Sequence, residues 1–272
     1  MIIYLIVGAL FGGLGLILWI VKGKKEGKSA SLELMDTSRI KDVVQNYTEM
    51  NASMGDGSFS LHCEVKGKAH SDTPIESDLS KEQVVYFSSK IVHEYEKQVT
   101  KKNSKGEKET KWVKYKDTVS ENKRWANDFG VKDDTGFIAV NANNSKFHTE
   151  KLFSNFEKGE PNQNSGGINI SIKGFSLGIG GGKNKGIRTI GYRYTETGIR
   201  NGTDLYVVGD ANDRDGKLEI SKPKDKNDQF IVSVKSKDEF IGSIGSAVKG
   251  LTIGAIVSWV AAAAIIVYGI VN

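Results

Sequence analysis

The residues best suited to covalent or metal chemistry are one cysteine and four histidines, and their positions offer no reactive pair and no ligand spacing. Cys63 follows His62 within the strand-like run 61–65, where successive side chains point to opposite faces. The thiol therefore shares a face with Leu61 and Val65, which we expect to be buried. One cysteine supplies neither a disulfide nor a cysteine-based zinc site. The sequence thus predicts no catalytic residue and no metal site.

Two other motifs imitate ligand-binding loops but fail in detail. A phosphate-binding loop over Gly178–Lys183 would need glycine where Leu177 stands and serine or threonine where Asn184 stands. A calcium loop over 210–216, counted back from its glycine, would begin with Ala211, which has no ligating side chain. We therefore expect turns at both places and no bound cofactor.

The elements that must position the chain are two uncharged apolar runs at its ends, Ile2–Val21 and Leu251–Val271. A helix of roughly 20 such residues spans about 30 Å of hydrocarbon. The first run has no positively charged start and leads straight into lysines, which argues against a cleaved signal peptide. The sequence predicts an integral membrane protein with transmembrane helices over 1–22 and 250–272 and the lipid bilayer as its partner.

Small residues within these runs favour close helix packing. Gly8 and Gly12 are four residues apart, as in the motif that lets membrane helices approach closely. The second run contains the alanine stretch Ala261–Ala264, which is the natural partner for these glycines. We also expect that such helices could hold a homo-oligomer together.

Basic residues flank the two runs on the side of the central domain. They are Lys22, Lys24, Lys25, Lys28, Lys235, Lys237 and Lys249. The positive-inside rule then predicts a domain on the cytoplasmic side. The net charge of +5 is modest, the lysines mix with acids over 97–116, and arginines are scattered. Nucleic acid is therefore not an expected partner.

The residues between the runs predict a mainly β fold: a compact antiparallel domain, barrel-like or sandwich-like, with short helices. Short runs rich in β-branched and aromatic residues are bounded by Gly, Asn and Asp. The predicted strands cover 59–67, 83–99, 111–120, 136–140, 168–177, 186–196, 204–208 and 217–220. The polar stretches 101–111 and 157–167 are expected to be surface loops.

Two helices are expected to flank these strands. An apolar stripe at helical spacing predicts a helix from 37 to about 51, with Asp36 as its N-cap. This helix belongs to a segment, 23–58, that we expect to be a basic linker followed by an amphipathic helix. The capping-box sequence at 236–239 begins a juxtamembrane helix over 236–249, which we expect to run into the second span.

The phrases of the central domain, in their order, resemble a known family. They are LHCEVKGKAHSDTPIESDLSKEQVVYFSSKIVHEYE, FGVKDDTGFIAVNA, YTETGIRNGTDLYVVGDANDRDGKLEISKP and FIVSVKSKDEF, followed by a membrane helix. Together they resemble the GIDE domain of the Mulan-type mitochondrial membrane-anchored ubiquitin ligases and their prokaryotic relatives. The resemblance runs from about Leu61 to the second span and implies a GIDE-like β domain over 59–235.

The resemblance implies a RING-type ubiquitin transferase, yet a RING needs about eight Cys and His ligands for two zinc ions. One cysteine is present, and the chain ends at Asn272, directly after the second span. We therefore expect a prokaryotic-type member without the RING. In the mitochondrial relatives the domain faces the intermembrane space, whereas the lysines here favour the cytoplasmic side.

The function that we predict is binding rather than catalysis: a domain tethered at both ends that binds an unknown protein or peptide at the membrane surface, for sensing or scaffolding. The residues that match the family phrases are the candidate ligand-binding surface: Glu94, Tyr95, Glu96, Asp133, Asp134 and Thr135. A plain type I turn is the other reading of the second group. The alternative function is ubiquitin ligation together with a separate RING partner. A third alternative is an enzyme whose site the sequence does not reveal.

Overall fold

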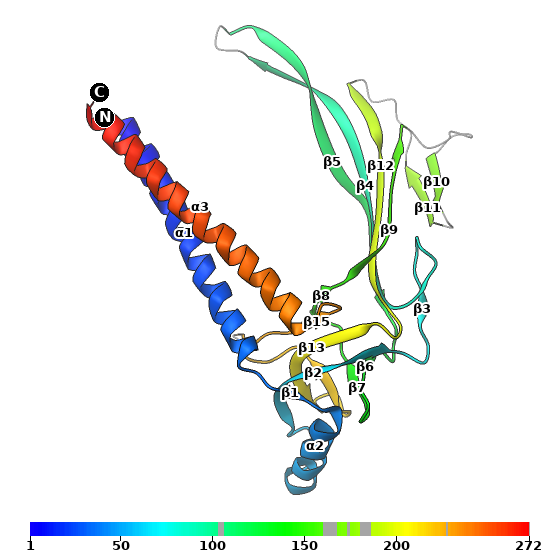
Figure 1. Ribbon diagram of the computed structural model, residues 1–272. Coiled ribbons are helices and arrows are strands. Elements are labelled where there is room, and N and C mark those ends of the chain that lie inside the picture. The colour runs from blue at the N-terminus through cyan, green and yellow to red at the C-terminus, as the bar shows by residue number, and fades with distance from the viewer. Residues whose placement is uncertain (103–105, 160–167, 173–174, 180–185, 227, 272) are drawn as a thin grey trace.

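A computed structural model describes residues 1–102, 106–159, 168–172, 175–179, 186–226 and 228–271 (Figure 1). The helices are α1 (Ile2–Glu33), α2 (Ile40–Met54) and α3 (Lys237–Val271). The strands are β1 (Thr37–Ser38), β2 (Ser60–His70), β3 (Ile75–Glu76), β4 (Gln83–Lys102), β5 (Lys108–Trp125), β6 (Gly130–Lys132), β7 (Phe137–Val140), β8 (Lys146–His148), β9 (Glu150–Lys158), β10 (Ile168–Ile172), β11 (Phe175–Ile179), β12 (Ile187–Arg200), β13 (Asp204–Asn212), β14 (Glu219–Ser221) and β15 (Ile231–Ser233).

Five strands close into a small barrel, because their pairings return to the strand where they start. β2 pairs with β6, β6 with β7, β7 with β14, β14 with β13, and β13 again with β2. β1, β15 and β8 complete this eight-stranded sheet outside the ring. The mainly β, barrel-like fold that the sequence predicts is therefore confirmed.

Alternation along β2 and β13 gives the barrel two buried faces instead of one. Cys63, Val65 and Val207 point into the main hydrophobic core inside the barrel. Their neighbours Glu64 and Tyr206 point outward and are nevertheless buried, at 0% and 2% exposure. The predicted burial of the cysteine is confirmed, and removal from water raises the pKa of its thiol to about 11.

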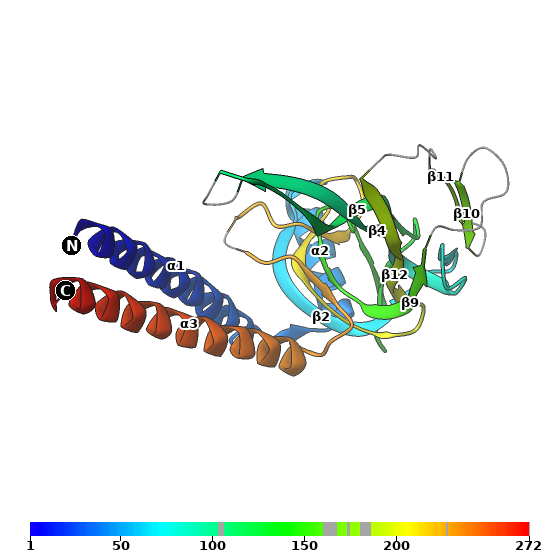
Figure 2. The same cartoon turned by 90° about the horizontal axis from the view of Figure 1, so that it is seen from above.

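A second, open sheet has the strand order β5-β4-β12-β9, with β3 beside the start of β4. β4 pairs with β12 as far as Lys97 and with β5 as far as Lys102. Past β12 the two strands continue as a hairpin on the side toward which the helices extend, as both views show (Figures 1 and 2). The strands occupy most of the expected loop 101–111, because pairing continues to Lys102 and Lys108.

The segment after β9 only partly follows the predictions. In place of one strand over 168–177, the structure has the antiparallel pair of β10 and β11. The expected loop 157–167 begins within β9, and its residues from 160 onward lie outside the described residues. Most of the glycine run 178–183 lies outside them as well.

Helices α1 and α3 run antiparallel to each other, so that both chain ends lie at the tip farthest from the barrel (Figure 1). Each is long and apolar enough to cross a membrane. The basic segment expected as a linker is helical instead, since α1 continues to Glu33 with a 3.0 Å ion pair between Lys22 and Glu26 one turn apart. The predicted capping box is confirmed: Ser236 and Glu239 exchange hydrogen bonds, and α3 runs unbroken into the second apolar run.

Close approach of these helices depends on glycines seven residues apart. A Cβ added at Gly8 would clash with Ile266 and lie 3.4 Å from the carbonyl oxygen of Ala262, and one at Gly15 would clash with the ring of Trp259. A Cβ added at Gly12 would meet no described atom within 4 Å. Of the two glycines singled out in the sequence, the structure thus places Gly8 against α3 and Gly12 away from it.

Candidate functional site

The candidate ligand-binding residues lie in two separate places. Glu94, Tyr95 and Glu96 lie on β4 in the open sheet, close to the hairpin. The Asp133–Thr135 turn connects β6 and β7 of the barrel. The structure therefore does not bring the two groups together in one site.

The Asp133 turn caps helix α2. The Oδ2 atom of Asp133 accepts the N–H of Ile40 at 3.0 Å, and Oγ1 of Thr135 accepts the N–H of Lys41 at 3.1 Å. Burial by itself raises the pKa of Asp133, but the hydrogen bonds from Ile40 and Thr135 outweigh it and hold the pKa below its usual range. These residues thus anchor a helix to the barrel.

This cap corrects the expected start of α2. The sequence predicted a helix from residue 37 with Asp36 as its N-cap. In the structure Thr37 and Ser38 pair with β2 as strand β1, and the helix begins at Ile40. The residue at the N-cap position, Arg39, makes no side-chain capping hydrogen bond. The Asp36 prediction was wrong because a distant turn supplies the carboxylate.

Glu94 and Glu96 are engaged in ion pairs on one face of the open sheet. Oε1 of Glu94 accepts Nε of Arg193 at 2.9 Å and lies 3.2 Å from Nζ of Lys116. Oε2 of Glu96 accepts Nε of Arg188 at 2.6 Å. The hydrogen bond from Arg193 is the largest cause that lowers the pKa of Glu94. Both carboxylates are therefore already balanced by charges within the sheet.

Tyr95 points to the opposite face, where four rings form a row across three strands. Tyr115 on β5 stacks with Tyr95 at 5.7 Å between ring centroids, Tyr95 with His93 at 4.9 Å, and His93 with Tyr192 on β12 at 4.6 Å. The Tyr95 hydroxyl donates to Oδ2 of Asp117 at 2.8 Å. Exposure falls from 39% at Tyr115 to 1% at Tyr192. This aromatic row is thus an accessible surface at one end and is fixed in a packed interior at the other.

A second site, which sequence reasoning missed, lies where the helices meet the barrel. The carboxylate of Glu64 accepts the hydroxyl of Thr37 at 2.6 Å and that of Tyr206 at 3.1 Å, and it lies 3.0 Å from Nζ of Lys237. Burial raises the pKa of Glu64, but the Thr37 hydrogen bond and the Lys237 ion pair outweigh it and lower the pKa. Because Thr37 follows α1 and Lys237 begins α3, this carboxylate joins both helices to β2.

Apolar side chains surround this helix junction and exclude water from it. They come from the end of α1, the start of α3 and the outer face of the barrel: Leu32, Met35, Phe240, Ile241, Ile244, Tyr206, Val208 and Ile231. Alternation in 61–65 predicted which residues share a face with Cys63. No local signal indicated that the helices would cover the other face.

One group of side chains could in principle ligate a metal ion. His62, Asp210 and Asp228 place ligand atoms within 4.8 Å of one another. However, Asp210 already contacts Nδ1 of His62 at 2.9 Å and Nη2 of Arg214 at 3.2 Å. The guanidinium already balances the negative charge of Asp210, which a bound cation would need. We therefore assign no metal to this group.

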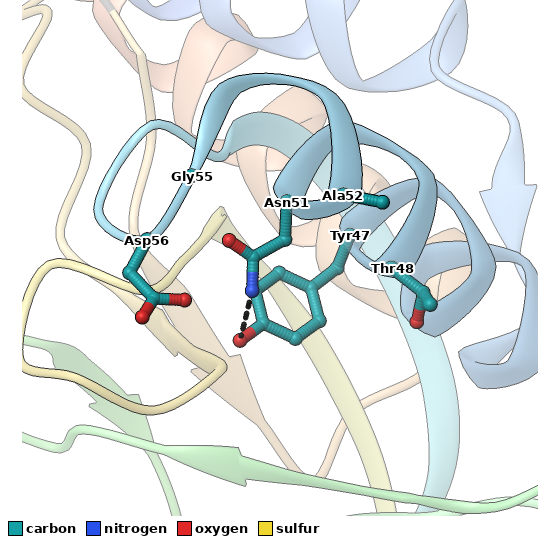
Figure 3. Close-up of a pocket in the computed structure, with 6 residues that line it drawn as sticks. All are labelled: Tyr47, Thr48, Asn51, Ala52, Gly55 and Asp56. Carbon is teal, nitrogen blue, oxygen red and sulfur yellow. Dashed lines mark hydrogen bonds between the residues drawn. The ribbon is translucent and has the colours of Figure 1, made fainter.

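A hollow lies beside the last turns of α2 (Figure 3). It is lined by Tyr47, Thr48, Asn51, Ala52, Gly55 and Asp56. Asn51 donates a hydrogen bond to the Tyr47 hydroxyl at 3.4 Å. Asp56 is the one carboxylate among the lining residues. This set offers neither a nucleophile–base pair nor a cluster of charges.

Comparison with known proteins gives one match. The model of the GIDE family, whose description reads "E3 Ubiquitin ligase", matches residues 96–267, which is more than half of the chain. This range begins on β4 beside the aromatic row and ends within the apolar part of α3. No curated protein matches the chain, and no solved structure matches it.

Proposed function

Because this chain belongs to the GIDE family, we propose that it is a two-pass membrane protein whose open sheet binds a protein or peptide at the membrane surface. The observation that carries the proposal is the aromatic row formed by Tyr115, Tyr95, His93 and Tyr192. The cytoplasmic side of the membrane is part of the proposal and rests on the lysines that flank the spans.

An aromatic row of this kind suits recognition for two reasons. Tyrosine rings offer a large contact area with little side-chain entropy to lose, and tyrosine is enriched at protein interfaces. The row is also ordered before any ligand arrives, since Tyr192 is buried and each ring is stacked on the next. A preorganised surface loses less entropy on binding.

The edge of the open sheet adds a second means of binding. In the described residues, β5 pairs with β4 along one edge and its other edge has no partner strand. Tyr115 lies midway along this strand. An extended peptide could add to the free edge by backbone hydrogen bonds and place its side chains against the exposed end of the row.

Site-specific photocrosslinking in native membranes tests this binding function. A photoreactive side chain replaces Val113, which is two residues from Tyr115 on β5 and therefore on the same face, and is 39% exposed. We expect a crosslinked product of defined mass, and we expect Tyr95→Ala with Tyr115→Ala to abolish it. The same photoreactive side chain at Phe137, which is 42% exposed on the barrel, is the matched control.

Three results decide this test. Products at position 113 no stronger than those at 137 contradict the proposal. Retention of the product in the double tyrosine variant contradicts it as well. Glu96→Gln, on the opposite face, should leave the product unchanged.

The family description favours a second candidate function, ubiquitin ligation. The only cysteine is buried and its thiol pKa is raised to about 11, so the chain offers no accessible thiolate for a thioester step. We therefore propose any ligase role as one shared with a separate RING protein. Conjugation assays with the purified chain should yield no product until such a protein is added, and product from the chain alone would overturn this view.

A further inference from the structure

We propose that the end of the β4–β5 hairpin binds anionic lipid headgroups of the membrane surface that the two helices enter. The hairpin end comprises residues 97–102 and 106–114. The proposal rests on the membrane anchorage proposed above, and it does not depend on the aromatic row or on its ligand. It gives the protein a third contact with the membrane.

The position of the hairpin is the first argument. The hairpin rises from the domain on the side toward which α1 and α3 extend, and α2 lies at the opposite end (Figure 1). The view from above agrees, since hairpin and helices leave the barrel toward the same side (Figure 2). A bilayer crossed by the two helices therefore lies on the side to which the hairpin points.

The lengths of the elements are the second argument. After its apolar run, α1 continues from Lys22 to Glu33, which is about 18 Å of helix. The polar start of α3, from Lys237 to Lys249, is about as long. The barrel is thus held roughly 20 Å from the bilayer. Val85 and Tyr86 at the start of β4 belong to the barrel core. The remaining 16 residues, from Phe87 to Lys102, have an extended length of about 53 Å, which is longer than this gap.

The charge of the hairpin end is the third argument. It carries six lysines and two glutamates, a net charge of +4, while the whole chain has a net charge of +5. Glutamates are interspersed, yet lysines outnumber them three to one at this end. The six lysines are Lys97, Lys101, Lys102, Lys108, Lys111 and Lys114, and all six are exposed. Lysines near an anionic membrane strengthen attachment by roughly fivefold each.

The packing of the hairpin end is the fourth argument. Beyond the hydrogen bond from Gln98 N–H to the carbonyl of Gly186, β4 and β5 pair only with each other among the described residues. Such a ribbon is marginally stable in water. Trp112 lies opposite Gln98, at the base of this ribbon. It is 39% exposed, although the guanidinium of Arg188 lies 4.3 Å from its ring centroid.

Exposed lysines at a sheet edge also prevent pairing with other chains. That role does not call for an exposed tryptophan beside them. Lysine together with tryptophan is the combination found where proteins meet the headgroup layer. We therefore favour a lipid surface as the occupant.

A fluorescent label on the hairpin end of the full chain tests the proposal. A cysteine introduced as Thr110→Cys is the accessible thiol, because Cys63 is buried. The labelled protein is inserted into nanodiscs of phosphatidylcholine, with or without phosphatidylserine. We expect phosphatidylserine to lower quenching by acrylamide in the water roughly twofold or more, and to raise quenching by a nitroxide on lipid headgroups.

Charge reversal separates the hairpin end from charge in general. The variant Lys101→Glu, Lys102→Glu, Lys111→Glu should remove the effect of phosphatidylserine. The matched control reverses Lys41, Lys132 and Lys217, which are also exposed and lie on α2, on β6 and beside β14. This control should respond to phosphatidylserine as the wild type does.

The possible results are distinct. A label that responds equally in both lipids, or a hairpin variant that still responds to phosphatidylserine, overturns the lipid contact alone. A chain that does not enter the nanodiscs at all overturns the membrane anchorage too. Free phosphoserine added to phosphatidylcholine nanodiscs should change nothing, and a response to it would identify a soluble anion as the ligand.

Discussion

The barrel and the open sheet each contain a glutamate that is paired with basic side chains, but the two pairs differ in how far they are exposed to solvent. The side chain of Glu64 is fully buried and contacts Lys237, which is 15% exposed, and Lys66, which is 45% exposed. The side chain of Glu94 is 13% exposed and contacts Arg193 and Lys116, which are 43% and 66% exposed. Breaking a buried pair leaves an uncompensated charge and costs about 3–5 kcal/mol. An exposed pair contributes about 0–1 kcal/mol. Substitutions in the barrel and the helix junction should therefore cost more folding free energy than substitutions on the surface of the open sheet.

The largest expected difference between the two regions concerns aromatic packing. Phe129 is 2% exposed in the barrel core, and Tyr115 is 39% exposed in the aromatic row. Phe129→Ala should lower the free energy of unfolding by about 3–5 kcal/mol through the cavity that it leaves. Tyr115→Ala should cost about 1 kcal/mol, the contribution of one stacked pair. Chemical unfolding in mild detergent, followed by near-ultraviolet circular dichroism, measures both, and equal losses would break the comparison.

The second difference concerns the two glutamates. Glu64→Gln should lower the free energy of unfolding by about 3 kcal/mol, because Lys237 keeps its charge in a nearly buried place. Glu94→Gln should lower it by less than about 1 kcal/mol. The same unfolding experiment at neutral pH measures both changes. A loss at Glu94 as large as that at Glu64 would show that the open sheet is not the tolerant region.

Lowering the pH tests the contribution of Glu64 to the free energy of unfolding in a second way. The pKa of Glu64 in the folded protein lies below its ordinary value of 4.5. Its contribution is therefore fully present above about pH 4.5 and is lost as the pH falls through the lowered pKa. The gap in stability between the wild type and Glu64→Gln should narrow over that range. A gap that stays constant down to pH 3 would indicate that the carboxylate is not the group responsible.

The smallest difference is expected at the edge of the barrel, between Asp133, which caps α2, and its neighbour Asp134. Asp133→Ala should cost about 1–2 kcal/mol, the usual loss for a helix cap. It should also speed amide hydrogen exchange at Ile40, whose N–H donates to this carboxylate. Asp134→Ala, next to it and exposed, should stay within about 0.5 kcal/mol. Equal exchange rates in both variants would argue that the turn does not hold the helix.

Prediction from the sequence succeeded where a pattern is local. Alternation placed Cys63 and Val65 on a buried face, and the structure has both in the barrel core. The capping box at 236–239 marked the start of α3, and the apolar runs marked both long helices. It failed at Asp36, because the carboxylate that caps α2 belongs to a turn almost a hundred residues away.

The sequence by itself determined that the chain has two apolar helices around a mainly β domain, since helix and strand periodicities are written in neighbouring residues. Only the tertiary structure decided what covers the second face of β2 and which rings stand beside Tyr95. The two-residue period of a strand shows which face a side chain is on, but it does not show which segment packs against that face. Glu64 joins the two long helices to the barrel, and the β4–β5 hairpin extends beyond β12, because segments far apart in the chain contact each other.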